Sequence, residues 1–146
     1  MLSLMINSLP PEVLAQALDA LPVRVFWKDL DSCYLGCNQR FAEDAGMSDP
    51  KDFIGKSDYY SYHPDQALAF RTDDANVMYT GVPKFGIVEK LTRADGVTIW
   101  LETNKLPLLD EEGRVVGIIG TYQDITERKL ADDEACRACL RELTDV

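Results

Sequence analysis

Histidine is nearly absent from this sequence, since His63 is the only one among 146 residues. A serine or cysteine nucleophile needs a neighbouring base, and that base is most often a histidine. The glycines stand apart from one another, so the sequence contains no glycine-rich loop that could cradle a phosphate. We therefore expect that the chain itself is not an enzyme.

Basic residues are also scarce. Fifteen lysines and arginines face 25 acidic residues, which gives a formal net charge of −10. Such a surface repels nucleic-acid phosphates and anionic lipid headgroups. No apolar run approaches the roughly 20 residues that a membrane-spanning helix needs. The sequence thus predicts no nucleic-acid partner and no membrane contact by this segment.

The four cysteines do not form an evident framework of disulfides or metal ligands. Cys33 and Cys37 would lie about 13 Å apart on one strand, which is too far for a disulfide. Cys136 and Cys139 form a CxxC in a charged helical stretch, and a single CxxC cannot complete a structural zinc site. We expect reduced thiols, no metal site and a cytoplasmic location.

The patterns that are present predict a mixture of strands and helices. β-branched and aromatic runs bounded by turn residues indicate strands, and apolar residues at helical spacing indicate helices. Helices are expected at 11–21, 38–46, 65–79 and 125–143, short helical turns within 47–64, and strands at 23–28, 33–37, 82–91, 97–107 and 114–124.

Two strands, a helical block, three strands and a trailing helix define an α+β domain. Its sheet should be antiparallel, with the helices packed mainly on one face. We expect an N-terminal segment with an amphipathic helix at 1–21, a core at 22–124 and an output linker helix at 125–146. The helix 11–21 carries an apolar stripe that includes Leu14 and Leu18, which predicts a homodimer.

Six stretches, in this order and spacing, resemble the PAS family of sensory domains. They are Val25–Asp29, Tyr34–Phe41, Phe53–Asp58, Gly96–Trp100, Pro107–Gly117 and the Asp-Ile-Thr junction at Asp124–Lys129. One departure is Ser32, where members of the family often have a turn glycine.

This resemblance implies a five-stranded antiparallel sheet of order 2-1-5-4-3 that cups helices around a small cavity. Such domains sense ligands or cofactors, dimerise through terminal helices and regulate a linked output domain. The parent protein would then be a sensor histidine kinase or a diguanylate cyclase. Two alternatives stay open: a ligand-free dimerisation and relay module, and a haem- or flavin-loaded redox or gas sensor.

The sequence gives weak support to either cofactor. His63 could be a haem ligand, but it also suits the entrance of a helix. A covalent flavin photosensor would need a cysteine where Gln39 stands, so only non-covalent flavin, stacked on Trp27 or Trp100, is left open. Packing of both tryptophans in or on the sheet is the favoured explanation.

The predicted cavity is largely apolar with a few hydroxyls, which suits a small organic ligand. A filled core with hydroxyls bonded to the backbone is the alternative. The expected lining residues are Tyr60, Phe70, Leu101, Thr103, Ile119 and Thr121.

The last strand is expected to pass directly into the output helix. Asp124, Ile125 and Thr126 mark this junction. The acid and the hydroxyl can accept hydrogen bonds from the unpaired N–H groups at the start of the helix. We expect the signal to leave the domain here.

Overall fold

A computed structural model describes residues 10–144, which form a five-stranded sheet with helices around it. The elements are α2 (Pro11–Ala20), β1 (Arg24–Asp29), β2 (Tyr34–Cys37), α3 (Gln39–Asp44), the 3₁₀ helices η1 (Pro50–Phe53) and η2 (Asp58–Tyr60), α4 (Pro64–Thr80), β3 (Lys84–Thr92), β4 (Thr98–Leu109), β5 (Val115–Asp124) and α5 (Thr126–Thr144). The expected N-terminal segment lies partly outside the described residues.

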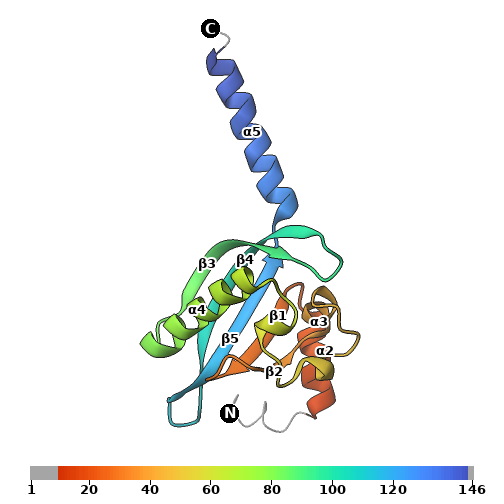
Figure 1. The fold of residues 1–146 in the computed structure, drawn as a ribbon, viewed down its shortest axis with the longest axis vertical. Helices are drawn as coiled ribbons and strands as arrows, with labels where there is room; N and C mark the ends of the chain where they lie inside the picture. Colours follow the sequence, from red (N-terminus) through yellow and green to blue (C-terminus); the bar gives the residue numbers. More distant parts are fainter. Residues whose placement is uncertain (1–9, 145–146) are drawn as a thin grey trace.

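The strand order is β2-β1-β5-β4-β3, and every neighbouring pair is antiparallel. The first strand and the last strand therefore lie side by side at the centre of the sheet. The predicted α+β fold and strand order are confirmed. Figure 1 shows α3 and α4 in front of the sheet, whereas α5 leaves the end of β5 and projects away from the domain.

The β1–β2 hairpin explains how the sequence tolerates Ser32 at a turn position. Ser32 adopts φ 57°, the left-handed region that favours glycine. The Asp29 carboxylate accepts hydrogen bonds from the backbone N–H groups of Asp31 and Cys33, at 2.9 and 3.0 Å. Side-chain bonding to the turn backbone in this way stabilises a conformation that serine alone disfavours.

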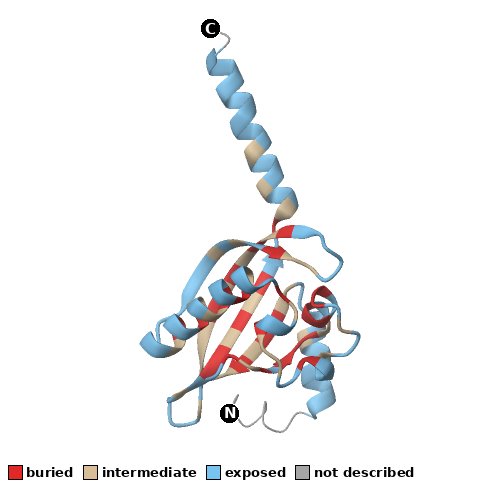
Figure 2. Cartoon of the chain, viewed as in Figure 1, coloured by how far each residue is buried: buried red, intermediate tan, exposed pale blue. Residues whose placement is uncertain are grey.

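The helix α4 begins and ends where local chemistry dictates. His63 caps its first turn by accepting a hydrogen bond from the Asp65 N–H, Pro64 occupies the first helical position, and Gly81 ends it at φ 68°. Its buried residues Ala67, Phe70, Asp74 and Val77 share one face. Figure 2 shows burial concentrated on the strands behind this helix.

The two terminal helices contribute little to the core, because neither α2 nor α5 contains a buried residue. Packing against the core therefore supplies little of the stability that an isolated helix lacks in water. No helix within residues 10–144 is long and apolar enough to cross a bilayer.

Candidate functional site

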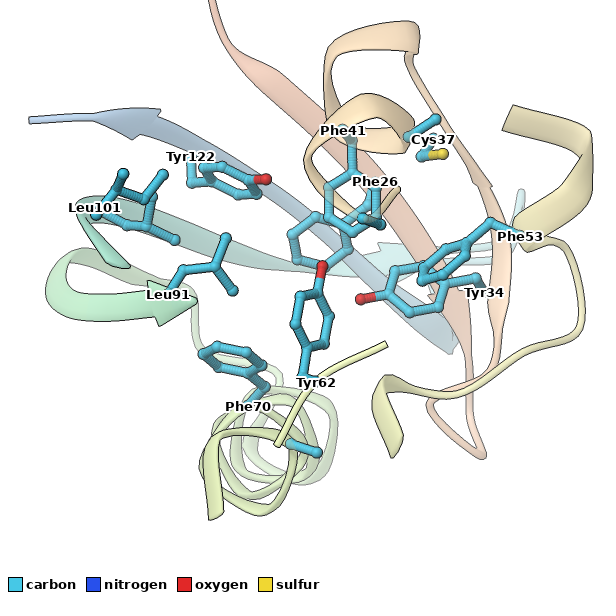
Figure 3. Close-up of a cluster of buried hydrophobic side chains, with 14 residues drawn as sticks. Phe26, Tyr34, Cys37, Phe41, Phe53, Tyr62, Phe70, Leu91, Leu101 and Tyr122 are labelled. Atoms are coloured by element: carbon cyan, nitrogen blue, oxygen red, sulfur yellow. The ribbon is translucent and has the colours of Figure 1, made fainter. Parts of the chain in front are cut away.

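An interior cavity lies between the inner face of the sheet and the helices. Its volume is about 30 Å³. Six aromatic rings form most of the wall, joined by the aliphatic side chains of Leu91 and Leu101 (Figure 3). These rings belong to Phe26, Tyr34, Phe41, Tyr62, Phe70 and Tyr122.

Strand β4 supplies one side of the cavity through alternate residues. Leu101, Thr103 and Lys105 are buried and line it, whereas Glu102 and Asn104 between them are half-buried on the other face. This alternation follows from the two-residue period of a strand. A single strand therefore presents one face to the cavity and the other to the outside of the sheet.

Four buried charged residues form a network beside the cavity. The Lys28 Nζ lies 2.6 Å from both Asp58 Oδ2 and Asp74 Oδ2. The Lys105 Nζ lies 2.8 Å from Asp74 Oδ1 and donates to the Phe70 carbonyl at 3.0 Å. Each of these side chains is 2% exposed or less. The network joins β1, η2, α4 and β4.

Two buried tyrosines donate hydrogen bonds to buried carboxylates near the cavity, and Tyr34 joins the network in this way. The Tyr34 hydroxyl donates to Asp58 Oδ1, and the Tyr122 hydroxyl donates to Asp44 Oδ2 at 2.7 Å. Burial, followed by nearby ionisable groups, raises the pKa of both phenols well above the usual range. Both hydroxyls therefore keep their protons and continue to donate.

Two polar groups at the cavity, the Thr103 hydroxyl and the Glu89 carboxyl, lie outside this network of ion pairs and hydrogen bonds. The Thr103 hydroxyl is buried, and within residues 10–144 its Oγ1 has no hydrogen-bond partner. Burial raises the pKa of the Glu89 carboxyl, and the charge of Lys105 and the nearness of the Thr103 hydroxyl oppose this rise. Thr103 thus lies near Glu89 without a well-formed hydrogen bond to it. A buried polar group left in this state favours a bound polar atom.

Three of the six expected cavity residues, Phe70, Leu101 and Thr103, line the cavity. The other three do not. Tyr60 is 59% exposed, and Tyr62, two residues later, supplies the ring instead. Ile119 and Thr121 are half-buried and lie on the outward face of β5. The alternate residues Ile118, Gly120 and Tyr122 are buried on its inner face.

The alternation of side chains along β5 explains why Ile119 and Thr121 do not line the cavity. Gly120 lies opposite Phe26, and a Cβ at Gly120 would come within 2.1 Å of the Phe26 ring. Gly120 therefore faces the core and gives the ring its space, so Ile119 and Thr121 point away. An apolar residue and a hydroxyl can suit either face of a sheet, and the sequence around them did not distinguish the two.

Sequence reasoning missed the charged residues of the cavity. Lys28, Glu89 and Lys105 are all lining residues. A signal was present in α4, where Asp74 interrupts an otherwise apolar stripe with Ala67, Phe70 and Val77. An acid on the core face of a helix requires a buried cation, and the two lysines on inward strand positions supply it.

The junction residues lie at the start of α5. The Asp124 Oδ1 accepts from the Thr126 backbone N at 2.9 Å and from the Thr126 hydroxyl at 2.6 Å. The same hydroxyl accepts from the Trp100 backbone N at 3.0 Å, and the Ile125 N–H donates to the Trp100 carbonyl at 2.9 Å. The first turn of α5 is therefore fastened to β4.

The residues considered for cofactors lie away from the cavity. The His63 side chain is 68% exposed. Trp27 packs over Gly36, where a Cβ would come within 2.4 Å of the indole. Trp100 lies under the ammonium groups of Lys90 and Lys129, at 4.9 and 5.1 Å from its ring centroid. Both tryptophans thus pack on the sheet.

A five-stranded antiparallel sheet in this order, cupping helices around a small interior cavity, defines a sensory type of α+β domain. The sequence matches the PAS fold family over residues 18–130. The chain belongs to the PAS family.

Two curated relatives are a sensor protein and a regulatory histidine kinase. The aerobic respiration control sensor protein ArcB of Escherichia coli (strain K12) is 31% identical over 121 residues, 83% of this chain and 15% of ArcB. The methanogenesis regulatory histidine kinase FilI of Methanothrix harundinacea (strain 6Ac) is 34% identical over 110 residues, 75% of this chain and 12% of FilI. The chain thus corresponds to a small part of each relative.

A solved structure corrects one expectation. The VqmA–ligand–DNA complex from Vibrio cholerae matches with a TM-score of 0.74 and 29% identity, over 82% of this chain and 53% of VqmA. A similar domain thus occurs in a protein that binds DNA. The expectation of no nucleic-acid partner, drawn from the charge of −10, is therefore wrong. The charge of one domain limits only its own surface, and the unmatched part of a longer protein can carry a different charge.

Proposed function

We propose that this chain is the sensory input domain of a longer signalling protein. It binds a small ligand in the interior cavity and regulates a downstream output domain through α5. The observation that carries the proposal is the arrangement of β4. This strand lines the cavity with Leu101, Thr103 and Lys105 and contacts the first turn of α5 through Trp100.

The route of the signal follows from this arrangement. A ligand that bonds to Thr103 or Lys105 shifts β4, because both side chains extend from its inner face. Residues 100 and 102 of the same strand hold α5, through the Trp100 backbone and the ion pair between Glu102 and Arg128. A strand movement of small size thereby changes the direction of a 19-residue helix.

The output domain that we propose is a histidine kinase. FilI carries that activity in its name, and it is 34% identical to this chain over 110 residues. This relationship favours a kinase over the diguanylate cyclase that we also considered. We place the domain in the cytoplasm, where its four free thiols would remain reduced.

Homodimerisation is part of the proposal. The helix α2 exposes Val13 and Leu14, at 43% and 40%, and a groove of about 540 Å³ runs from α2 to Trp27 and Pro50. A second copy that covers this apolar surface would stabilise α2 and set two α5 helices side by side. Dimerisation would thus let the two copies act on one output unit.

Native mass spectrometry of the purified protein, combined with a metabolite screen by melting temperature, tests the ligand proposal. A ligand present at 100 times its Kd stabilises the folded state by about 2.7 kcal/mol. The expected result is a retained or added small molecule whose stabilising effect is weaker in Thr103→Val. Thr121→Val on the outer face is the matched control. A broad screen without mass change or melting shift contradicts the proposal.

The small size of the cavity favours a second candidate, a ligand-free dimerisation and relay module. At about 30 Å³ the cavity is well below the ~300 Å³ at which ordinary ligand pockets begin. A monodisperse dimer without bound mass would support this candidate. The absorption spectrum of the same sample tests the haem- or flavin-loaded sensor, because either cofactor gives the protein a visible colour.

A further inference from the structure

The cavity limits the size of what it can hold in its present shape. Its volume is about 30 Å³. A single water molecule needs about 10–15 Å³ measured in this way, so about two waters fit. A ligand of about two or three non-hydrogen atoms occupies the same space. Anything larger requires the aromatic side chains of the wall to move.

The charges around the cavity do not cancel. Lys28 and Lys105 are positive, and Asp58 and Asp74 are negative, so the buried network is neutral as a unit. Glu89 also lines the cavity, and no ion pair reaches its carboxylate from any residue between 10 and 144. The ionised site thus has two positive and three negative groups, one negative charge in excess.

The remaining polar groups suit a hydrogen-bond donor. The Glu89 carboxylate can only accept, and the unpartnered Thr103 oxygen, 2% exposed, can accept as well. Both groups line the cavity, and Glu89 on β3 lies opposite Leu101 on β4, two residues from Thr103. An ammonium has more than one N–H, so a single ligand can donate to both groups.

The aromatic wall suits a positive charge. Two lysines already use its rings: the Lys28 Nζ is 4.7 Å from the Tyr34 centroid, and the Lys105 Nζ is 5.8 Å from that of Phe70. Among the described residues, no cation lies over the rings of Phe41 and Tyr62, which also line the cavity. The face of an aromatic ring attracts a cation, and more strongly where water is excluded.

We propose that the cavity selects a small organic cation, an alkylammonium of two or three non-hydrogen atoms, with Glu89 as its counter-charge. This inference rests on the proposed function, that the cavity binds a ligand. The ammonium donates to Glu89 and Thr103 while its alkyl part contacts the rings. An anion of the same size would raise the excess negative charge to two in a buried site, which is unfavourable.

Three probes of nearly equal size and different charge test this selectivity: ethylammonium, ethanol and acetate. Their affinities are measured on the full 146-residue chain by NMR titration at constant ionic strength, from the amide shifts of Glu89, Leu101 and Thr103. Ethylammonium is expected to bind about tenfold more tightly than ethanol, because a desolvated cation near aromatic rings and a carboxylate gains that much. Acetate is expected to bind most weakly.

Glu89→Gln supplies the decisive variant, since it removes the charge and keeps the shape. It is expected to reduce ethylammonium binding to the level of ethanol. Glu102→Gln is the matched control on the outer face of β4 and should leave all three affinities unchanged. This control also separates cavity binding from general attraction of cations to an acidic surface.

The outcomes separate the inference from the proposed function. If ethanol or acetate binds the wild-type protein as tightly as ethylammonium, the charge selectivity is wrong and ligand binding stands. If Glu89→Gln binds ethylammonium as tightly as the wild type does, Glu89 is not the counter-charge and the inference fails. If no probe perturbs the cavity amides and the metabolite screen is also negative, both proposals are overturned.

Discussion

The Thr126 hydroxyl accepts a hydrogen bond from the Trp100 backbone N at 3.0 Å and donates one to Asp124 at 2.6 Å. One side chain therefore joins the strand that lines the cavity, the end of the last strand and the first turn of α5. Because three elements meet at one hydroxyl, a change in β4 cannot leave the start of α5 unaffected. The first prediction concerns this junction.

Thr126→Val and Asp124→Ala each remove hydrogen bonds from the start of α5. We expect each to lower the free energy of unfolding by about 0.5–2 kcal/mol, measured by urea denaturation. Thr126→Ser keeps the hydroxyl and should stay close to the wild type. In the full-length parent, the same two variants should weaken the response of the output to ligand without changing ligand affinity. A response that survives both would show that the junction is only a helix cap.

Asp74 holds both buried lysines, so its removal should be costly. Asp74→Ala leaves Lys28 with one carboxylate and Lys105 with none, and we expect a loss of about 3–5 kcal/mol in the free energy of unfolding. The neighbouring Asp73→Ala breaks a surface ion pair with Lys84 and should cost about 0–1 kcal/mol. Chemical denaturation compares the two. Equal losses would mean that the buried network contributes no more than a surface pair.

Thr103→Val tests whether its hydroxyl is unsatisfied in the ligand-free protein. Valine keeps the shape and removes a buried polar atom that lacks a partner, so the variant should be more stable than the wild type by about 1–3 kcal/mol. Thr121→Val is the control, because the Asn104 amide donates to the Thr121 hydroxyl at 3.3 Å. A loss of stability in Thr103→Val larger than in the control would indicate a bond to an ordered water.

Glu89 should make stability depend on pH in a defined direction. Burial raises its pKa in the folded state above the ordinary glutamate value, against the opposing effects of Lys105 and Thr103. Below the ordinary value both states hold the proton and the carboxyl has no effect. As the pH rises through the window between the unfolded and folded pKa, the unfolded state releases its proton first, so the folded state loses stability.

Glu89→Gln removes this titration and should be more stable than the wild type above the window. The difference in free energy of unfolding should grow with pH across the window and then become constant. Urea denaturation at a series of pH values measures it, with Glu102→Gln as the control. A difference that does not change with pH would show that the Glu89 carboxyl is solvated in the folded state.

Leu14→Glu should weaken the proposed dimer. Leu14 is 40% exposed on α2, and a charge there would need desolvation at an apolar interface. We expect light scattering to report a shift toward monomer while circular dichroism stays unchanged. Gln16→Glu adds the same charge to the same helix and controls for net charge. A wild-type protein that is monomeric at high concentration contradicts the prediction at its first step.

The sequence by itself determined the order and type of the elements. Period-two runs, helical apolar stripes and turn residues are local signals, and they locate β3, β4, β5 and α4 to within a few residues of the structure. The family resemblance supplied the strand order. The sequence places Phe70, Leu101 and Thr103 at the cavity because it predicts both the helix or strand that carries each residue and the face on which the side chain lies.

Only the tertiary structure decided which charged residues enter the core and which face of β5 carries the cavity. The parity of β5 depends on the space that Gly120 leaves for the Phe26 ring, a contact between strands that are distant in sequence. Lys28, Asp58, Asp74 and Lys105 look like surface residues one at a time, since each would be unstable if buried alone. Folding brings three lysine–aspartate pairs among them to 2.6–2.8 Å, and this pairing makes their burial possible.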